Sequence, residues 1–344
     1  MNIPDTISSE RELDRILAEP SSQLIEFVEG LSGNLVVLGA GGKMGPSLCV
    51  RARRAVEAAG SDVRVVAVSR FSDAGSRKDL ERQGVETIAC DLMDPRSVEK
   101  LPDADNIIFL VGWKFGTAEN PGRTWAVNTL TPSLVSRRYP SARIVALSSG
   151  NVYPFSNPDD GGSTEQDPVG PVGEYAWSCL GRERVFEHWS ITNGTPMVLV
   201  RVNYAVELRY GVLVDIALRI RDGLPVDLST GYLNCIWQGD ANDVIIRSLD
   251  LAGSPPAILN LTGPGIYDVR GLATRIGSRM DRPVVFSGEE AETALLNDAS
   301  FALKTFGEPR VDLRTVARWT ADWVRRGGAL LDKPTHFEVR DGKF

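Results

Sequence analysis

Short apolar runs alternate with amphipathic helical segments over the first two thirds of the chain. The runs are rich in Val, Ile and Leu and are bounded by polar or glycine-containing turns, which is typical of buried strands. Strands that are apolar on both faces and that alternate with helices predict a parallel sheet covered on both sides. We therefore expect an α/β fold with a Rossmann-type, doubly wound parallel sheet, whose strands cover residues 34–40, 62–69, 85–90, 105–112, 142–149 and 196–202.

The alternation ends after residue 202, and this change divides the chain. Residues 33–202 are expected to form the main domain, and residues 203–330 mainly a smaller α/β lobe. Residues 1–32 are predicted to be a helical N-terminal extension, and residues 331–344 a tail that alternates like a strand or an extended arm. In the smaller lobe the pattern predicts helices over 212–223, 240–251, 268–280 and 312–327 and short extended pieces near 225–228, 257–261 and 283–286.

The composition narrows the function classes. Of the 344 residues, 42% are hydrophobic and 24% are charged, as in soluble globular proteins. The formal net charge of −7 argues against a general binder of nucleic acid or of anionic membranes. No apolar run approaches the ~20 residues of a membrane-spanning helix, and no secretion signal is found. Four scattered cysteines and two histidines form no metal-binding motif. These features predict a reduced, metal-free, cytoplasmic protein.

A glycine-rich turn follows the first predicted strand directly and precedes a helix. In "GAGGKMG", Gly39, Gly42 and Gly45 are spaced three residues apart, and Lys43 and Met44 lie between the last two of them. Glycines in this position allow a tight turn and let backbone N–H groups approach a pyrophosphate at a helix N-terminus. The context predicts that residues 33–202 bind a dinucleotide, the alternative being a tight turn with no ligand.

The end of the second predicted strand bears on the choice of dinucleotide. An acidic residue there would accept hydrogen bonds from the ribose 2′-OH of NAD, but this chain has Ser69 followed by Arg70. A hydroxyl and a guanidinium suit a 2′-phosphate, which favours NADP over NAD, and Lys43 would add a second positive contact. The alternative is that Arg70 and Lys43 are solvated surface charges.

Several motifs in a fixed order resemble one family. From about residue 33 to 325 the chain is similar to extended short-chain dehydrogenase/reductases of the NAD-dependent epimerase/dehydratase family. The resemblance rests on "GAGGKMG", "CDLMD", "IIFLVG", Asn128 in "WAVNTLTPSLV", "ALSSGNVYP", "TEQDPVGPVGEYAWS" and "QGDANDV". It implies that Asp91 and Leu92 lie beside the adenine and that Val111 and Gly112 lie under the nicotinamide ribose.

The resemblance also implies a catalytic pair. Ser149 matches the residue that hydrogen-bonds the reacting oxygen, and Tyr175 matches the catalytic acid/base that also borders the cofactor. Asn203 stands where the family often places a substrate contact, and we expect Asn151, in the motif of Ser149, to contact substrate as well. The chemistry implied is hydride transfer between nicotinamide and a carbon that bears oxygen, with a proton moving in step.

The lysine that follows the family's tyrosine by four residues is absent here. Positions i and i+4 share a helix face, and that lysine lowers the pKa of the tyrosine and binds the ribose. Cys179 takes its place and would pack on the cofactor without supplying a charge. Four readings remain open: Lys114 substitutes for the missing cation, Tyr175 acts only as a neutral proton donor, the site is inactive, or Cys179 is a nucleophile.

The smaller lobe bears on the substrate. Nucleotide-sugar enzymes of the family often carry an arginine where this chain has "GYLNCIWQGDAND". Without it, a smaller polar or acidic substrate fits better, and Trp113, Lys114 and Arg209 are candidate contacts, with Arg201 and Trp237 as further ones.

The function expected from the sequence is that of an NAD(P)-dependent oxidoreductase or epimerase/dehydratase-like enzyme. Its substrate is expected to be carbohydrate-like or a hydroxy/oxo acid. The alternative is a catalytically impaired NADP(H)-binding regulatory or scaffold protein. The resemblance further implies a homodimer, formed through helices near 122–138 and 173–190.

Overall fold

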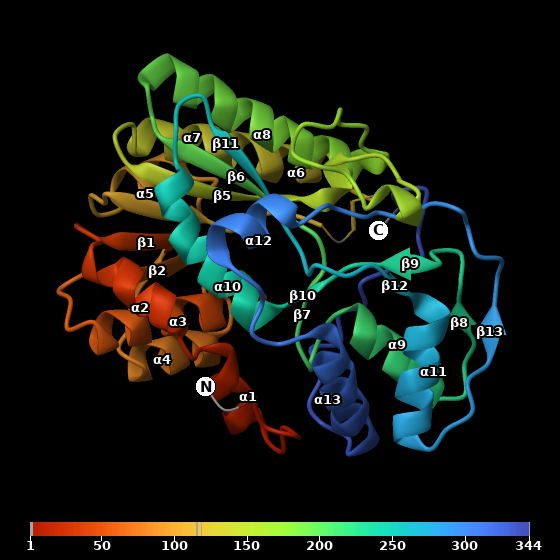
Figure 1. The fold of residues 1–344 in the computed structure, drawn as a ribbon. Coiled ribbons are helices and arrows are strands. Elements are labelled where there is room, and N and C mark those ends of the chain that lie inside the picture. The colour runs from red at the N-terminus through yellow and green to blue at the C-terminus, as the bar shows by residue number, and fades with distance from the viewer. Residues whose placement is uncertain (1–2, 115, 118, 344) are drawn as a thin grey trace.

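A seven-stranded sheet forms the centre of the protein. The computed structural model describes residues 3–114, 116–117 and 119–343, so residues 1–2 of the predicted extension and residue 344 of the tail lie outside the described residues. Neighbouring strands all pair in parallel, in the order β11-β6-β5-β4-β1-β2-β3. The predicted parallel Rossmann-type sheet is confirmed (Figure 1). The strands are β1 (Leu35–Leu38), β2 (Val65–Ser69), β3 (Glu86–Ala89), β4 (Asn106–Phe109), β5 (Arg143–Ser149), β6 (Met197–Val202) and β11 (Ala257–Leu261).

Helices cover both faces of this sheet because successive side chains of a strand point to opposite sides. Val37 belongs to the core cluster under one set of helices, while Val36 and Leu38 belong to the cluster under the other. One face carries α2 (Ser22–Glu29), α3 (Gly45–Ala58) and α10 (Gln238–Arg247). The other face carries α5 (Pro95–Glu99), α7 (Thr131–Arg138) and α8 (Gly173–Asn193). The helices α4 (Ala74–Arg82) and α6 (Pro121–Trp125) and the π-helix Ala126–Leu130 complete the connections.

The predicted N-terminal extension is helical. It contains α1 (Glu10–Leu17) and all of α2, and Ser9 caps α1 by accepting the N–H of Glu12. The Glu12 carboxylate accepts the N–H of Ser8 at 2.8 Å, one residue before the cap. Leu13 and Leu17 of α1 are buried in the core of the smaller lobe, whereas Leu24 of α2 packs under the main sheet. The extension therefore joins both parts of the molecule.

The smaller lobe is built on three helices that pack together: α9 (Val212–Arg221), α11 (Val269–Met280) and α13 (Leu313–Arg325). Trp237 and Trp319 stack edge to face in its core, with ring centroids 5.5 Å apart. Helix α12 (Ser300–Phe306) instead packs against β11, and its Ala302 belongs to the core beneath the main sheet. The remaining elements of the smaller lobe are three two-stranded pairs. These pairs are β7 (Ala205–Val206) with β10 (Ile236–Trp237), β9 (Tyr232–Leu233) with β12 (Tyr267–Asp268), and β8 (Val226–Asp227) with β13 (Phe286–Ser287).

The chain returns from the smaller lobe to the main sheet. Helix α10 packs on α3, and β11 pairs in parallel with β6 at the edge of the central sheet. Residues 257–261 were predicted as an extended piece of the smaller lobe, and that placement is wrong. Five residues of strand-forming sequence fit either sheet, because a strand's pairing partner is not encoded in its own pattern.

Residues 331–343 cross from the smaller lobe to the start of α8, and we call them the C-terminal strap. Thr335 donates its N–H and hydroxyl to the Asp215 carboxylate on α9, at 2.8 and 2.5 Å. Phe337 is buried in the core of the smaller lobe. The backbone of Gly342 lies so close to Gly173 that a Cβ on Gly342 would approach backbone atoms of residues 172 and 173 to within 2.8 Å. The described residues of the strap include no β-strand, so of the two predicted forms, a strand or an extended arm, the strand is not formed.

Candidate active site

The glycine-rich turn has the geometry that its sequence predicts. Gly39 has φ +86°, which favours glycine, and its N–H donates to Val68 O at 2.8 Å. A Cβ on Gly45 would approach Ala40 O to 2.2 Å, so any larger residue would push the turn off α3. Gly42 and Met44 lie between them, and no side chain caps the N-terminus of α3. Its first N–H groups are thus positioned to receive an anion.

A cavity of about 550 Å³ opens beside this turn, along the carboxyl ends of β1, β2, β3 and β4. Its walls combine a glycine surface, a polar rim at the end of β2 and an apolar side formed by residues after β3 and β4. This set suits a dinucleotide, since the pyrophosphate needs a bare backbone and the adenine an apolar surface. The predicted cofactor residues that line it are Gly39, Gly42, Ser69, Arg70, Asp91, Leu92, Val111 and Gly112, and the predicted substrate residue Trp113 lines it too.

Lys43 does not take the position predicted for it. Its Nζ lies over the Tyr210 ring, 3.3 Å from the centroid, and Lys43 is not part of the cavity lining that contains Arg70. Burial, reinforced by the positive charges of Lys114 and Lys333, lowers the pKa of Lys43 to about 7. The Lys43 side chain therefore points to the smaller lobe, where it reaches the ring of Tyr210 in the segment after β7.

Tyr175, Ser149 and Cys179 come together as the spacing predicts. Tyr175 stands in the first turn of α8, and its side chain is hydrogen-bonded to Ser149, at the end of β5, and to Cys179. Burial and the neighbouring Cys179 thiol raise the pKa of Tyr175 well above its usual range, against the opposing effects of Arg182 and of the Ser149 hydrogen bond. Burial likewise raises the pKa of Cys179, so both groups are neutral at physiological pH. A neutral, buried thiol is not an activated nucleophile.

Lys114 reaches the same place from the loop after β4. Its Nζ lies over the Tyr175 ring, 5.8 Å from the centroid, and it donates to Thr335 O of the C-terminal strap at 3.4 Å. Burial lowers the pKa of Lys114 to about 8, although Cys179 and Asp215 act in the opposite direction. The ammonium group is therefore mostly protonated at neutral pH and lies beside the tyrosine.

Arg182 is a second cation near Tyr175, and sequence reasoning missed it. It stands on α8 seven residues after Tyr175 and raises the acidity of the phenol. It donates to Leu147 O at 2.9 Å and to Asn128 Oδ1 at 2.7 Å. Asn128 in turn accepts the N–H of Trp113 at 2.9 Å, which ties Arg182 to the loop after β4. The signal was present, because positions i and i+7 also share a helix face.

Two of the arginines proposed as substrate contacts are held in ion pairs. Arg201 donates to both Glu183 carboxylate oxygens, at 3.0 and 2.7 Å, and is almost fully buried. Arg209 pairs with Glu207 and with Asp14 of the N-terminal extension, so its guanidinium is engaged away from the Tyr175 site. Both predicted roles lose support for the same reason: sequence patterns do not show which carboxylate a buried arginine meets.

The other predicted substrate residues differ in their freedom to bind. Asn203 donates to Asn234 Oδ1 at 2.7 Å and to Leu295 O at 3.1 Å, so its amide N–H groups are engaged. Asn151 accepts from the Ser149 hydroxyl at 2.9 Å. The buried Nε1 of Trp113 has no hydrogen-bond partner among the described residues. An unpaired buried N–H next to the cofactor cavity is a natural contact for an oxygen of a ligand. Trp237 is buried in the core of the smaller lobe, against Trp319.

A comparison with protein families identifies the chain. The sequence profile described as the NAD dependent epimerase/dehydratase family matches residues 35–206, which is half of the chain. The chain belongs to the NAD-dependent epimerase/dehydratase family. The predicted family is thereby confirmed, and the matched region contains the glycine turn, Ser149 and Tyr175 of this family member. Among curated protein sequences, none matches the chain significantly.

Solved structures share the fold at low sequence identity. UDP-glucose 4-epimerase of Thermus thermophilus, complexed with NAD, has a TM-score of 0.69 and 20% identity, over 86% of this chain and 99% of that one. UDP-glucuronic acid 4-epimerase of Bacillus cereus, also with NAD, has a TM-score of 0.69 and 16% identity, over 85% of this chain and 99% of that one. The dTDP-glucose 4,6-dehydratase of Bacillus anthracis str. Ames, with NAD, has a TM-score of 0.70 and 14% identity, over 86% of this chain and 97% of that one.

Within the described residues, no helix combines the length and the apolar character needed to cross a membrane. In the same part of the chain no group of His, Cys, Asp or Glu side chains is arranged to hold a metal ion.

Proposed function

We propose that this chain is an NAD(P)-dependent oxidoreductase or epimerase/dehydratase that acts on a carbohydrate-like or hydroxy/oxo-acid substrate. The observation that supports this most is the hydrogen-bonded pair of Ser149 and Tyr175 at the carboxyl end of β5, in a chain whose glycine turn borders a dinucleotide-sized cavity. When bound, the nicotinamide would exchange a hydride with a substrate carbon. The residues of the chain would hold the substrate oxygen and move its proton.

The raised pKa of Tyr175 makes it a proton donor in this proposal. A neutral phenol can protonate an oxygen that gains charge as hydride arrives, and Ser149 would hold that oxygen in place. The tyrosinate left behind needs a cation nearby. Arg182 and Lys114 are both available for that role, in place of the lysine that Cys179 replaces.

For the substrate we propose an anionic or strongly polar carbohydrate-like molecule. Lys43 lies over the Tyr210 ring and Lys114 over the Tyr175 ring, and the positive charge of Lys114 helps to lower the pKa of Lys43. Two cations that are partly removed from water are stabilised by an anionic ligand. Solved structures of similar fold hold UDP-glucose or UDP-glucuronic acid, so these compounds should be tested first, together with free sugar acids.

For the cofactor we propose NADP. Arg70 is exposed at the rim of the cavity, and no hydrogen bond or ion pair holds its side chain within the described residues. Asp73 shares the rim, but its carboxylate already caps α4 by accepting the N–H groups of Gly75 and Ser76. NAD, which several solved structures of similar fold contain, is the competing choice, and affinity measurements separate the two cofactors.

A fluorescence titration of NADPH against NADH tests the cofactor proposal. Arg70→Ala should weaken NADPH binding about tenfold or more, since a charge-assisted hydrogen bond is worth ~1.5–3 kcal/mol, and should leave NADH binding unchanged. Arg64→Ala is the matched control, because Arg64 pairs with Glu86 at the other end of β2. Tighter binding of NADH than of NADPH by the unaltered chain would refute the preference for NADP.

Turnover tests the catalytic proposal. The chain would be incubated with NADP⁺ or NADPH and a panel of UDP-sugars, sugar acids and oxo acids. Tyr175→Phe and Ser149→Ala should each lower kcat by about 100-fold or more, the usual contribution of a positioned acid or base. Tyr139→Phe is the matched control, since its hydroxyl donates to Pro102 O before β4, at the opposite edge of the sheet. Unchanged turnover in both site variants would contradict the mechanism.

The alternative function is binding without catalysis, and Cys179 favours it because the thiol supplies no charge to Tyr175. It predicts NADPH affinity without turnover on any member of the panel. The Cys179→Lys variant helps to separate the readings: a large gain in activity indicates a degraded site, and a loss indicates an adapted one. Detecting turnover by the unaltered chain excludes this alternative.

We also propose that the chain forms a homodimer through α6, the π-helix and α8. Three large apolar side chains are exposed there, Trp125 at 36%, Leu130 at 53% and Trp177 at 50%. Exposed apolar groups of this size on adjoining helices suit an interface. Light scattering should show a dimer that Trp177→Glu dissociates, while Leu224→Glu, an equally exposed position in the smaller lobe, has no effect. A monomer at micromolar concentration would reject the proposal.

A cytoplasmic location, which four free cysteines suit, is likewise a proposal.

A further inference from the structure

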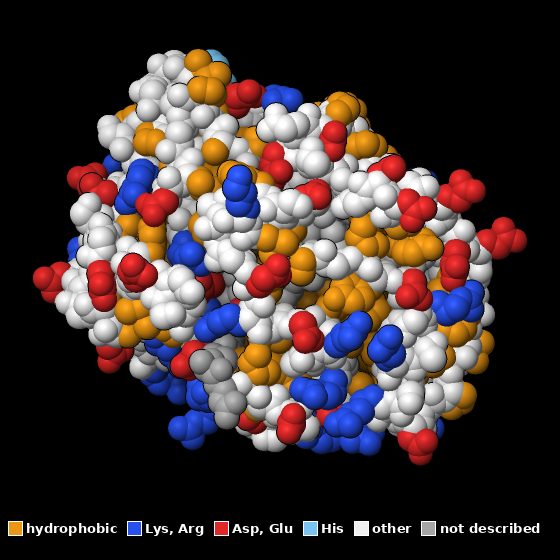
Figure 2. Space-filling view, viewed as in Figure 1, with side chains coloured by type: hydrophobic (Ala, Val, Ile, Leu, Met, Phe, Trp, Pro, Cys, Tyr) orange, Lys and Arg blue, Asp and Glu red, His pale blue; other side chains and the backbone are white. Residues whose placement is uncertain are grey.

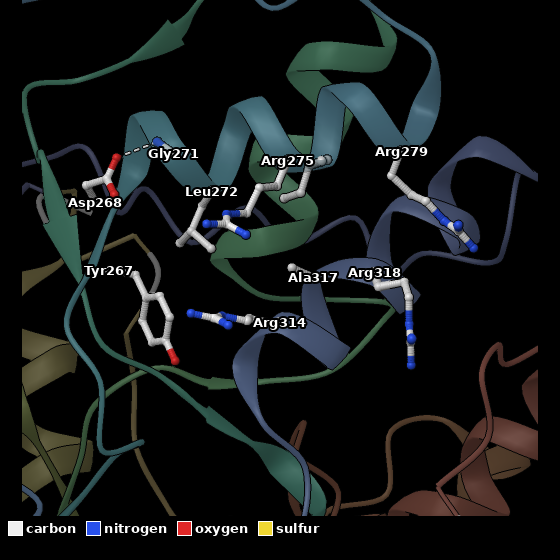
Figure 3. Close-up of a pocket in the computed structure, with 10 residues that line it drawn as sticks. Tyr267, Asp268, Gly271, Leu272, Arg275, Arg279, Arg314, Ala317 and Arg318 are labelled. Carbon is white, nitrogen blue, oxygen red and sulfur yellow. Dashed lines mark hydrogen bonds between the residues drawn. The ribbon is translucent and has the colours of Figure 1, made fainter.

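The smaller lobe contains a groove lined by four arginines. It lies between α11 and α13 and has a volume of about 260 Å³. Arg275 and Arg279 project from α11, and Arg314 and Arg318 project from α13 (Figure 3). Each pair is spaced i,i+4, so both members lie on the same side of their helix. The lining shares no residue with the cofactor cavity beside the glycine turn.

The positive charge in this groove is only partly neutralised. Like charges at i and i+4 destabilise a helix, so two such pairs facing each other carry a cost. Arg279 is paired with Asp322 at 2.8 Å, while Arg318 reaches only the exposed Asp5, at 3.8 Å, and its buried Nε has no hydrogen-bond partner in the described part of the chain. The remaining two, Arg275 and Arg314, form no hydrogen bond or ion pair within the described residues.

This concentration of cations is local. The chain as a whole carries a net charge of −7, yet Figure 2 shows Lys and Arg side chains gathered over α11 and α13. The carboxylate that lines the groove belongs to Asp268, which accepts the N–H of Gly271 as the cap of α11. Its charge is therefore directed to the helix N-terminus.

The groove also has an apolar part and an aromatic ring at one end (Figure 3). Leu272, Ile276 and Ala317 supply apolar lining between the arginines. The half-buried ring of Tyr267 stands at one end, and Arg275 and Arg314 extend toward it from the two helices (Figure 3). The groove thus offers guanidinium groups for an anion and, next to them, an aromatic ring.

We propose that this groove binds a phosphorylated small molecule, with the phosphate held between Arg275 and Arg314 and the attached ring packed against Tyr267. The planar guanidinium group matches the geometry of phosphate oxygens and binds them in pairs. A volume near the lower end of small-molecule sites suits a compact metabolite. Both a nucleotide and a sugar phosphate have this chemistry.

Calorimetry on the full chain distinguishes these sources. The probes are inorganic pyrophosphate, ADP and glucose 6-phosphate. Arg275→Gln and Arg314→Gln should each weaken binding about tenfold and the double variant about 100-fold or more, with weaker binding as salt increases. Arg64→Gln, an exposed arginine paired with Glu86 far from this groove, should have no effect. Tyr267→Ala should weaken the binding of ADP or of glucose 6-phosphate, depending on which of the two the groove accepts. It should leave the binding of pyrophosphate unchanged, because pyrophosphate has no ring.

Three outcomes would overturn the proposal. The first is that none of the probes binds at millimolar concentration. The second is binding that the double variant leaves unchanged although circular dichroism shows it folded. The third is binding that Arg70→Ala weakens and the double variant does not, which would place the probe in the cofactor cavity. Because Arg275 and Arg314 are exposed, their replacement should cost little stability, so a loss of binding reports on the groove.

Discussion

Lys43 and Lys114 should release their protons far below the pH at which an ordinary lysine does. Burial lowers the pKa of Lys43 from 10.5 to about 7 and that of Lys114 from 10.5 to about 8. For Lys114 the difference of pKa corresponds to roughly 3 kcal/mol at 1.36 kcal/mol per unit. Because the folded pKa is the lower one, this penalty on folding is fully present below about pH 8 and is relieved as the pH rises toward 10.5.

The neighbouring charges predict how each pKa responds to substitution. Lys114→Met removes the positive charge that most strongly opposes Lys43 and should raise the pKa of Lys43. Asp215→Asn removes a carboxylate that favours the charged form of both lysines and should lower both pKa values. Tyr210→Leu removes the ring 3.3 Å from Lys43 Nζ and should lower the pKa of Lys43 further.

The assay is NMR of ¹³C-methylated lysines followed over pH. The chain has seven lysines, so each signal can be assigned by a single replacement. The signals of Lys43 and Lys114 should titrate near pH 7 and pH 8, well below the ordinary lysine pKa of about 10.4. If neither signal titrates below that ordinary value, the burial of these two ammonium groups is wrong, and so is the placement of Lys114 against Tyr175.

Three further predictions follow from buried contacts. Gly342→Ala should detach the C-terminal strap from α8 and expose it to limited proteolysis, whereas Gly327→Ala, with a similar positive φ but open space around it, should not; equal cleavage of the two would refute the docking. Glu183→Gln should destabilise the fold by about 3–5 kcal/mol in urea unfolding, because it leaves buried Arg201 without its counter-charge, and a loss below 1 kcal/mol would contradict that. Ellman's reagent should label none of the four buried cysteines in the folded chain and all four in denaturant, and rapid labelling when folded would show that one is accessible.

The central sheet and the core of the site were predictable because both depend on local pattern. Gly39 and Gly45 are required by a turn that spans few residues, and Ser149 and Tyr175 follow from a strand end and a helix start. Such features are encoded in short windows of sequence. The smaller lobe's helices were predicted for the same reason.

What the sequence did not show depends on long-range contacts. The partner of Arg201 is buried Glu183 on another element, and the direction of Lys43 depends on the ring of Tyr210. The orientation of Arg182 depends on its hydrogen bonds to Leu147 O and Asn128 Oδ1, which lie 35 and 54 positions away in the sequence. The edge position of β11 likewise depends on which strand was left unpaired.

The C-terminal strap contributes to the burial of Lys114 but not to the lining of the cofactor cavity. The cofactor cavity is built from residues 39–131, whereas Lys114 meets Thr335 across 221 positions, and Asp215 meets it across 120. A chain cut before residue 335 would therefore keep its dinucleotide cavity and lose the enclosure of Lys114. Such a shortened chain would still be retained on a nucleotide column, so retention does not show that the strap is intact. The integrity of the strap in a preparation has to be measured separately.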